Sequence, residues 1–168
     1  METAGTTDDP VTKPIELFAP RSDADWTAAR RLVEEYVASL GLDLSFQDIA
    51  NELDHLAVEY APPTGAFFLA VEGDLHLGCV GVRRFEDGIG EIKRLYTTPA
   101  ARGRGLGRRL AEGVIAEGRR LGYRRLRLDT LPSMKAAHAL YTSLGFKAIS
   151  PYRFNPVEGT EFLELELG

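Results

Sequence analysis

The sequence from Gly90 to Leu121 reads G-E-I-K-R-L-Y-T-T-P-A-A-R-G-R-G-L-G-R-R-L-A-E-G-V-I-A-E-G-R-R-L and decides the fold. Its first part favours a β-strand over Glu91–Thr97, which Pro99 ends. A turn rich in glycine and arginine follows at Arg102–Gly107. Apolar residues then recur at helical spacing, which indicates an amphipathic helix. The stretch therefore predicts a strand, a glycine-rich turn and a helix in succession.

This succession is typical of a diphosphate site. The first turn of a helix has unpaired N–H groups at the positive end of the helix dipole, and glycine lets an anion approach the backbone closely. A dinucleotide motif G-x-G-x-x-G does not fit, because Arg108 or Leu110 stands where its last glycine should be. A P-loop does not fit either, because the turn has no lysine. The turn instead reads R-x-x-G-x-G, from Arg102 through Gly105 and Gly107.

The composition is that of an ordinary globular protein, with 44% hydrophobic and 27% charged residues in 168. Cys79 is the only cysteine, which excludes an internal disulfide and a cysteine-based zinc site. The start lacks the pattern of a signal peptide, and the longest apolar run, Ala66–Val71, is too short to span a bilayer. We expect a cytoplasmic protein with no membrane partner: a disordered leader over residues 1–13 and one domain over residues 14–168.

The net charge of −5 is unevenly distributed, because basic residues far outnumber acidic ones in residues 93–127. We interpret the arginines of the turn as cations for a polyanion, and the others as a solvated helix face. Nucleic acid is a less favoured partner, since this basic segment has few interleaved aromatic residues and the chain is acidic overall. We therefore expect no nucleic-acid partner.

The flanking segments predict a mixed α/β domain, ordered β-αα-βββ-α-β-α-ββ, with an antiparallel half and one crossover helix. One helix is expected between Ser22 and Gly41, and a second one capped by Ser45 with Asp48 and carrying Phe46, Ile49, Leu53 and Leu56. A short helix is expected over Ser133–Leu144, after a loop at Asp129–Pro132. The remaining strands are expected at Ile15–Phe18, Gly65–Glu72, Leu75–Phe85, Arg124–Leu128, Phe146–Ile149 and Phe162–Leu167.

Three sequence pieces together carry a family resemblance. They are the strand E-I-K-R-L-Y-T, the turn R-G-R-G-L-G, and A-L-Y-T-S-L-G-F at Ala139–Phe146, which is similar to the motif L-Y-x-x-x-G-F. In this order they resemble the GNAT superfamily of N-acetyltransferases. The resemblance implies an acetyl-CoA-dependent enzyme with the GNAT-type acyl-CoA N-acyltransferase fold, a mixed, mostly antiparallel twisted sheet flanked by helices.

The resemblance also implies where acetyl-CoA binds. In the family, the strand before the turn splays from its neighbour and offers its backbone to pantetheine, and the N–H groups of the turn hold the pyrophosphate. Many relatives carry Asn seven residues before the motif tyrosine, in contact with pantetheine, whereas this chain has Met134. The implied cofactor-binding residues are Leu95, Tyr96, Thr97, Arg102, Gly103, Arg104, Gly105, Leu106, Gly107 and Arg108.

Two residues match positions that carry chemistry in the family. Tyr141 matches the tyrosine that commonly protonates the coenzyme A sulfur as general acid. Glu91 matches a position used in some members as general base, often through water, while other members use water chains alone. No nucleophile is in place for a covalent acetyl-enzyme, so we expect direct transfer in a ternary complex.

The acceptor amine, on a small molecule or a peptide, is left open by the sequence. Acidic residues of the N-terminal helices would suit an amine or polyamine, whereas Arg83, Arg84, Lys93 and Arg94 would suit an acceptor with a carboxylate. The loop at Pro151–Pro156 is where relatives shape the acceptor pocket. An alternative function is a non-catalytic acyl-CoA-binding sensor. Homodimers are common in the family and are expected here by analogy. No metal is expected, because His55, His76 and His138 lack metal-ligand spacing.

Overall fold

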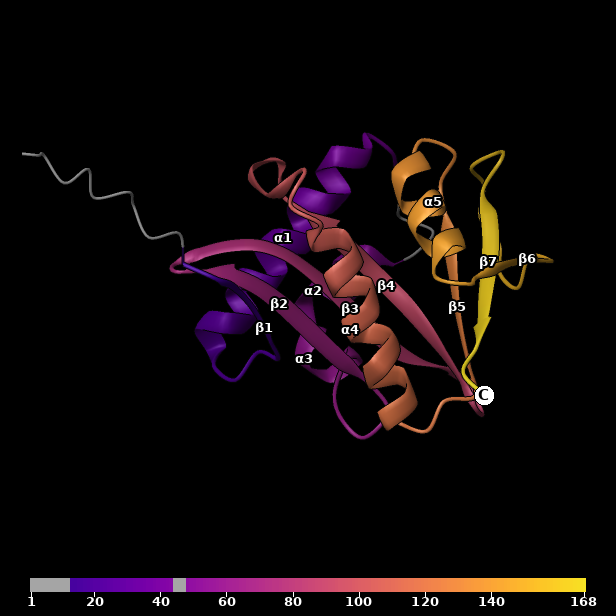
Figure 1. Cartoon of the computed structure of the whole chain (residues 1–168), viewed down its shortest axis with the longest axis horizontal. Helices are drawn as coiled ribbons and strands as arrows, with labels where there is room; N and C mark the ends of the chain where they lie inside the picture. Colours follow the sequence, from indigo (N-terminus) through magenta and orange to yellow (C-terminus); the bar gives the residue numbers. More distant parts are fainter. Residues whose placement is uncertain (1–12, 44–47) are drawn as a thin grey trace, which may run out of the picture.

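A computed structural model of the chain describes residues 13–43 and 48–168. Its strands form one sheet in the order β1-β2-β3-β4-β5-β7-β6, with helices on both faces (Figure 1). Neighbouring strands within the described residues are antiparallel, except for β4 and β5, which are parallel. This architecture confirms the expected mixed, mostly antiparallel sheet. The C-terminal hairpin of β6 and β7 lies at the β5 end of the sheet, with β7 next to β5, and β1 forms the opposite edge.

The elements follow the predicted order closely. The strands are β1 (Ile15–Phe18), β2 (Ala66–Glu72), β3 (Leu75–Glu86), β4 (Ile89–Thr97), β5 (Arg125–Thr130), β6 (Lys147–Ile149) and β7 (Glu161–Glu166). The helices are α1 (Asp23–Leu40), α2 (Ile49–Asp54), α3 (Leu56–Glu59), α4 (Leu106–Arg120) and α5 (Lys135–Ser143), with a 3₁₀ turn at Pro99–Ala101.

The ends of α1 are fixed by the residues that the sequence indicates. The side chain of Ser22 accepts a hydrogen bond from the Asp25 amide at 3.2 Å, which satisfies one of the free N–H groups of the first turn. Gly41 ends the helix with φ of 61°, a left-handed conformation that glycine adopts without steric cost. The predicted helix between Ser22 and Gly41 is therefore confirmed.

Two predicted segments need correction. The second N-terminal helix was expected as one element, but it breaks at His55 into α2 and α3, because His55 has a non-helical φ of −132°. Its expected cap Ser45 and its first apolar residue Phe46 lie outside the described residues. The expected loop at Asp129–Pro132 begins later, because Asp129 and Thr130 extend β5 by pairing with β7.

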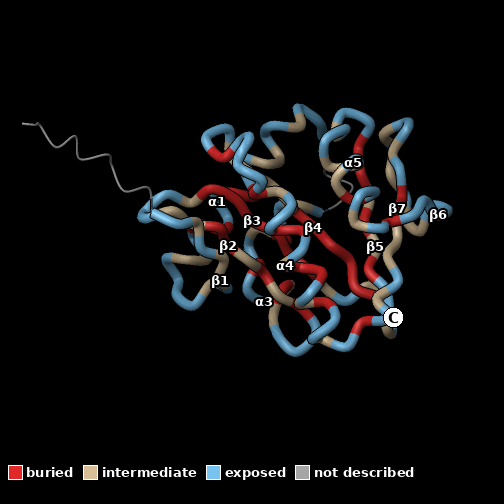
Figure 2. The backbone as a smooth tube through the Cα atoms, in the orientation of Figure 1, coloured by how far each residue is buried: buried red, intermediate tan, exposed pale blue. Residues whose placement is uncertain are grey.

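The core lies in two layers, one on each face of the sheet. Val80 and Val82 of β3 pack with Leu110 and Val114 of α4 on one face. Cys79, which precedes Val80 in the strand, packs on the other face with residues of α1 such as Leu32. Figure 2 shows this burial as continuous red segments along the central strands and the sheet-facing side of α4. The two layers hold β4 rigidly, and β4 carries most of the site described next.

Candidate functional site

The sheet opens between its two parallel strands. β4 and β5 pair only at Ile89–Arg125, Gly90–Leu126 and Glu91–Arg127, although both strands continue beyond these residues. The C-terminal half of β4 therefore has a free edge facing β5. The splay that the family resemblance implies is confirmed, and it leaves the backbone of Leu95, Tyr96 and Thr97 unpaired on the β5 side. An extended ligand could add to this edge like another strand.

A bulge in β4 lies beside this opening. The pairing with β3 steps from Gly81–Lys93 to Cys79–Tyr96, so β4 holds one extra residue, and Arg94 has a left-handed φ of 62°. The buried guanidinium of Arg94 binds the carboxylate of Glu52 through Nε at 2.7 Å and Nη2 at 3.2 Å. Such an ion pair can hold a non-glycine residue in a conformation that costs free energy. The bulge thus changes the direction in which side chains of β4 point, next to the opening.

The glycine-rich turn has the geometry that a diphosphate requires. Gly103 and Gly105 have φ of 76° and 70°, and a Cβ added at either residue would meet no atom within 4 Å. Gly105 is the N-cap of α4 and provides no side-chain cap. In the described part of the chain, no acceptor binds the backbone N–H groups of residues 103–108. An open turn with free N–H groups at a helix N-terminus fits the pyrophosphate of acetyl-CoA.

The arginines of the turn divide into two kinds. Arg104 forms an ion pair with Glu72, and Arg108 with Glu112 at 3.2 Å and with the Ser143 hydroxyl at 2.7 Å. These two guanidinium groups are therefore held by the protein itself. Arg102 instead lines the groove that runs from the turn along the free edge of β4, together with Leu95, Tyr96, Thr97, Gly107 and Ser133.

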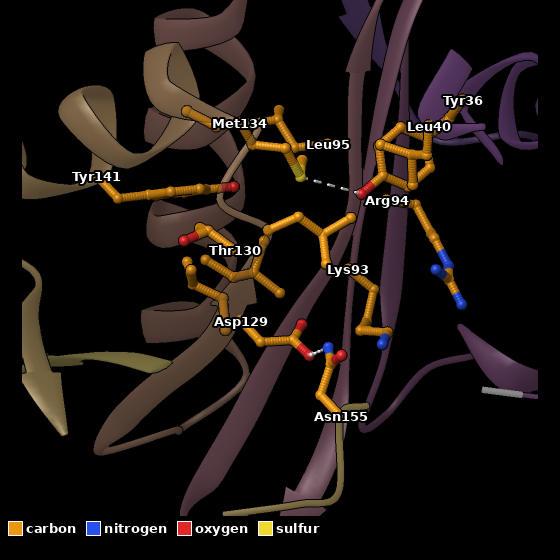
Figure 3. Close-up of a pocket in the computed structure, with 14 residues that line it drawn as sticks. Tyr36, Leu40, Lys93, Arg94, Leu95, Asp129, Thr130, Met134, Tyr141 and Asn155 are labelled. Carbon is orange, nitrogen blue, oxygen red and sulfur yellow. Dashed lines mark hydrogen bonds between the residues drawn. The ribbon is translucent and has the colours of Figure 1, made fainter. Parts of the chain in front are cut away.

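Tyr141 reaches the opening from α5. Its side chain is 4% exposed and its ring packs edge-on against Phe146, with centroids 5.2 Å apart. Figure 3 shows its hydroxyl pointing into the pocket between β4 and β5. Burial raises the pKa of Tyr141 above its ordinary value of 10.0, so the phenol stays protonated at neutral pH. A protonated hydroxyl in this place can donate to a group bound beside β4.

Glu91 lies at the last position of β4 that pairs with β5. It is 1% exposed, and both carboxylate oxygens lie near Arg153 Nη2, at 2.8 and 2.7 Å. Its Oε2 also accepts a hydrogen bond from the Tyr152 hydroxyl at 3.0 Å. The structure therefore places Tyr141 in the pocket and Glu91 next to it, with Glu91 already bound to two donors from the loop before β7.

Sequence reasoning missed part of this site. Asp129 was assigned to a loop, yet it faces the pocket from β5, and Asn155 reaches it from the loop before β7 at 3.4 Å. Tyr36 of α1 donates a hydrogen bond to the Met134 sulfur at 3.9 Å across the pocket (Figure 3). From the sequence, Tyr36 is only a residue of the helix expected between Ser22 and Gly41. The sequence could have indicated Asp129 only if β5 had been extended to Thr130, because Asp129 pairs with β7 as part of that strand.

The described residues form neither a metal-binding cluster nor a membrane-spanning helix. No group of three or more His, Cys, Asp or Glu side chains is arranged to hold a metal ion in residues 13–43 and 48–168. Over the same ranges, no helix has both the length and the apolar character needed to cross a membrane. Cys79 is fully buried, as expected, and its thiol contacts the Arg94 carbonyl oxygen at 3.3 Å.

Comparison with known proteins identifies the family. The model of the acetyltransferase (GNAT) family matches residues 27–146. An uncharacterized N-acetyltransferase of Schizosaccharomyces pombe is 38% identical over 155 residues, covering 91% of this chain and 95% of that protein. The chain therefore belongs to the acetyltransferase (GNAT) family. Its reaction class is acetyl-CoA-dependent N-acetyl transfer.

Solved structures agree with this assignment at the level of fold. An acetyltransferase from Streptococcus agalactiae superposes with a TM-score of 0.75 at 24% identity, covering 91% of this chain and 98% of that one. A Salmonella typhimurium protein, solved with its cofactor acetyl-CoA, superposes with a TM-score of 0.66 at 21% identity, covering 92% and 94%. The observed sheet, with its splayed parallel pair, is thus the GNAT acyltransferase fold that the sequence predicts.

Proposed function

We propose that this protein transfers the acetyl group of acetyl-CoA directly to the amine of a small molecule or peptide, with Tyr141 as general acid. The observation that carries the proposal is the position of the Tyr141 hydroxyl. It lies in the pocket where β4 leaves β5, beside the groove that leads from the glycine-rich turn. A proton donor is needed at that point, because the coenzyme A thiolate departs there.

Acetyl-CoA supplies an activated acyl group as a thioester, and this chain supplies the surfaces that orient it. The N–H groups of residues 103–108 would hold the pyrophosphate, with Arg102 beside them as a cation. The free edge of β4 at Leu95–Thr97 would pair with the amide groups of pantetheine. These contacts fix the thioester near the bulge, within reach of Tyr141.

The reaction then needs two proton movements. The neutral acceptor nitrogen attacks the thioester carbon, so a C–N bond forms and the C–S bond breaks, while Tyr141 gives its proton to the sulfur. The acceptor nitrogen loses one proton overall, which returns the system to neutrality once the phenolate of Tyr141 is reprotonated from solvent. Burial raises the pKa of Tyr141, so the phenol is protonated at neutral pH and its proton is present when the thiolate develops.

Glu91 is the proposed base, acting through water. Its carboxylate is buried and bound by Arg153 and Tyr152, so a water chain must link it to the acceptor nitrogen. Glu91→Gln tests the assignment by the pH profile of kcat/KM. If Glu91 is the base, the variant loses about 10²- to 10⁴-fold in rate and the acid limb of its profile disappears. A fall in rate with an unchanged profile would show that Glu91 only supports the site.

The acid is tested by Tyr141→Phe, which keeps the ring that packs on Phe146. We expect kcat to fall about 10²- to 10⁴-fold while the Kd for acetyl-CoA stays unchanged. The matched control is Tyr123→Phe, a tyrosine of the same core whose hydroxyl bonds the Thr64 carbonyl far from the pocket. Release of coenzyme A thiol is measured with a panel of amines.

The same experiment separates the proposal from the alternative of a non-catalytic acyl-CoA-binding sensor. A sensor would bind acetyl-CoA and release no thiol with any amine, before and after the change at Tyr141. Turnover that is equal in Tyr141→Phe and in the unchanged protein would remove Tyr141 from the mechanism. Homodimerisation stays a prediction that size-exclusion chromatography with light scattering can test.

A further inference from the structure

The pocket contains a buried ammonium group without an ionic partner. Lys93 stands on β4, two residues past the last pair with β5, and its residue is 5% exposed. Within residues 13–43 and 48–168, no carboxylate forms an ion pair with it. Its side chain lines the pocket (Figure 3). Burying an unpaired charge is costly, so this ammonium calls for an anion that the protein does not supply.

The nearby carboxylates are already bound to other cations. Glu91 is held by Arg153, and Glu52 is held by Arg94 at 2.7 Å and by Arg83 at 3.2 Å. Glu52, an acidic residue of the N-terminal helices, is therefore neutralised inside the protein. A further cation entering here would meet the positive charges of Lys93, Arg94 and Arg153. The site disfavours a ligand that carries positive charge alone.

One carboxylate in the pocket remains weakly bound. Asp129 lines the pocket from β5, two residues past the last pair with β4, and it lowers the electrostatic cost of the Lys93 charge without contacting it as an ion pair. Its bond from Asn155 is long, at 3.4 Å. Figure 3 shows Lys93 and Asp129 both directed toward Asn155. The pocket thus offers a cation and an anion that form no ion pair with each other, with the Asn155 amide beside Asp129.

We propose that this pocket is the acceptor subsite and that it binds a free amino acid. The carboxylate of the amino acid binds Lys93, and its amino group is oriented by Asp129, on the side of the pocket that Tyr141 also lines. The inference rests on the proposed function, because it names the acceptor class for the same site. An amino acid carries a carboxylate that can pair with Lys93 and an amino group that can pair with Asp129. A simple amine or a polyamine has no carboxylate for Lys93.

The lowered pKa of Lys93 is consistent with a carboxylate-binding role. Burial and the nearby Arg94 lower the pKa of Lys93 to about 8, while Glu91 and Asp129 oppose the shift. A bound carboxylate would favour the charged form and return the pKa toward its ordinary value. The Lys93 ammonium therefore has no ion-pair partner of its own among the described residues, and a bound anion would supply one.

The test compares amino acids with amines that differ from them only by loss of the carboxylate. The protein, saturated with acetyl-CoA, is assayed with the twenty protein amino acids and β-alanine, and then with the decarboxylated form of the best acceptor. We expect kcat/KM to be about 10- to 100-fold higher for the amino acid. Lys93→Met should remove this preference by lowering kcat/KM for the amino acid alone. Lys147→Met, on the exposed strand β6, should leave it intact.

The outcomes separate the two proposals. If the amine without a carboxylate is acetylated as well as the amino acid, or if Lys93→Met lowers both equally, the inference is overturned while acetyl transfer stands. It is equally overturned if acetyl-CoA binds and no amino acid is acetylated. If acetyl-CoA does not bind at all, the proposed function itself fails.

Discussion

The two sides of the opening between β4 and β5 are built in different ways. The proposed donor side, around Arg102–Arg108, consists of backbone: two left-handed glycines, free N–H groups and an unpaired strand edge. The acceptor side uses buried charged side chains, such as Glu52, Glu91 and Lys93, that come from distant parts of the chain. A backbone site suits a ligand that the whole family shares, whereas side chains can change from member to member without altering the fold.

This difference predicts opposite consequences for stability. The donor turn is open, so changes there should affect ligand binding far more than folding. The acceptor side is a buried ion-pair network, so changes there should affect folding as well.

The largest effect is expected from breaking the pair between Glu52 and Arg94. Glu52→Gln removes the charge that two arginines share in a buried place, and we expect a loss of about 3 to 5 kcal/mol in the free energy of unfolding. Burial opposes ionisation of Glu52, but Arg94 outweighs it and holds the pKa below the ordinary value of 4.5. The carboxylate therefore stabilises the fold above pH 4.5, and the contribution is lost as the pH falls through the lowered pKa.

Urea denaturation at pH 7 and at decreasing pH measures this effect. The control is Glu34→Gln, which removes an exposed pair with Arg30 and should cost about 1 kcal/mol or less. Equal losses in the two variants would mean that the acceptor-side network contributes no more than a surface ion pair.

A gain in stability is expected at Lys93. Lys93→Met replaces the unpaired ammonium by an apolar chain of similar length, and we expect about 1 to 3 kcal/mol more stability at pH 7. The pKa of Lys93 is about 8 in the folded protein and 10.5 ordinarily, so the unfolded chain binds more protons between these values. Stability of the unchanged protein should therefore rise across that window, and the advantage of the variant should shrink there.

The charges facing Lys93 are Glu91 and Asp129, which favour its ammonium form, and Arg94 and Arg153, which oppose it. Denaturation of both proteins at pH 7 and pH 10 makes the comparison, with exposed Lys147→Met expected within about 0.5 kcal/mol of the unchanged protein. A loss of stability in Lys93→Met at pH 7 would show that the ammonium is needed by the fold and not kept for a ligand.

The smallest effect is expected at Met134, where many relatives carry Asn. Met134 lines the groove and provides no side-chain cap to α5. Met134→Asn adds one hydrogen-bonding group toward pantetheine, so we expect acetyl-CoA to bind about 2- to 10-fold more tightly. Met134→Leu keeps the apolar character and should leave the Kd unchanged. Weaker binding by the Asn variant would show that the Met134 sulfur contributes to the site as it stands.

The two sides also differ in how far the sequence predicts them. The donor side is local, because a strand, a turn and a helix lie within about thirty residues, as in other anion sites at helix N-termini. Gly103 and Gly105 have a left-handed φ, whereas Gly107 lies in the first turn of α4. The acceptor side joins Glu52 to Arg94, 42 positions apart, and Glu91 to Arg153, 62 positions apart. Such pairs depend on strand register and loop path, which residue spacing does not reveal.

Errors of element bounds had the same origin. The sequence predicts a loop at Asp129–Pro132 because aspartate and proline are residue types that occur often in turns. Pairing with β7 overrides this preference and turns Asp129 toward the pocket. The break at His55 was missed because apolar spacing alone continues through it. Local patterns thus predicted the fold, and they missed residues whose positions depend on tertiary pairing; the donor site that they indicate stays a prediction.

The central claim is that the glycine-rich turn holds the pyrophosphate of acetyl-CoA, and calorimetric titration tests it most directly. Gly105→Glu places a carboxylate at the N-terminus of α4, and Gly122→Glu places one beyond its C-terminus. Both glycines have positive φ, 70° and 89°, with no atom within 4 Å of an added Cβ, so the backbone strain is matched. We predict micromolar binding of acetyl-CoA by the unchanged protein and by Gly122→Glu, and at least about 100-fold weaker binding by Gly105→Glu. Equal affinity in the two variants, or no binding by the unchanged protein, would contradict the account.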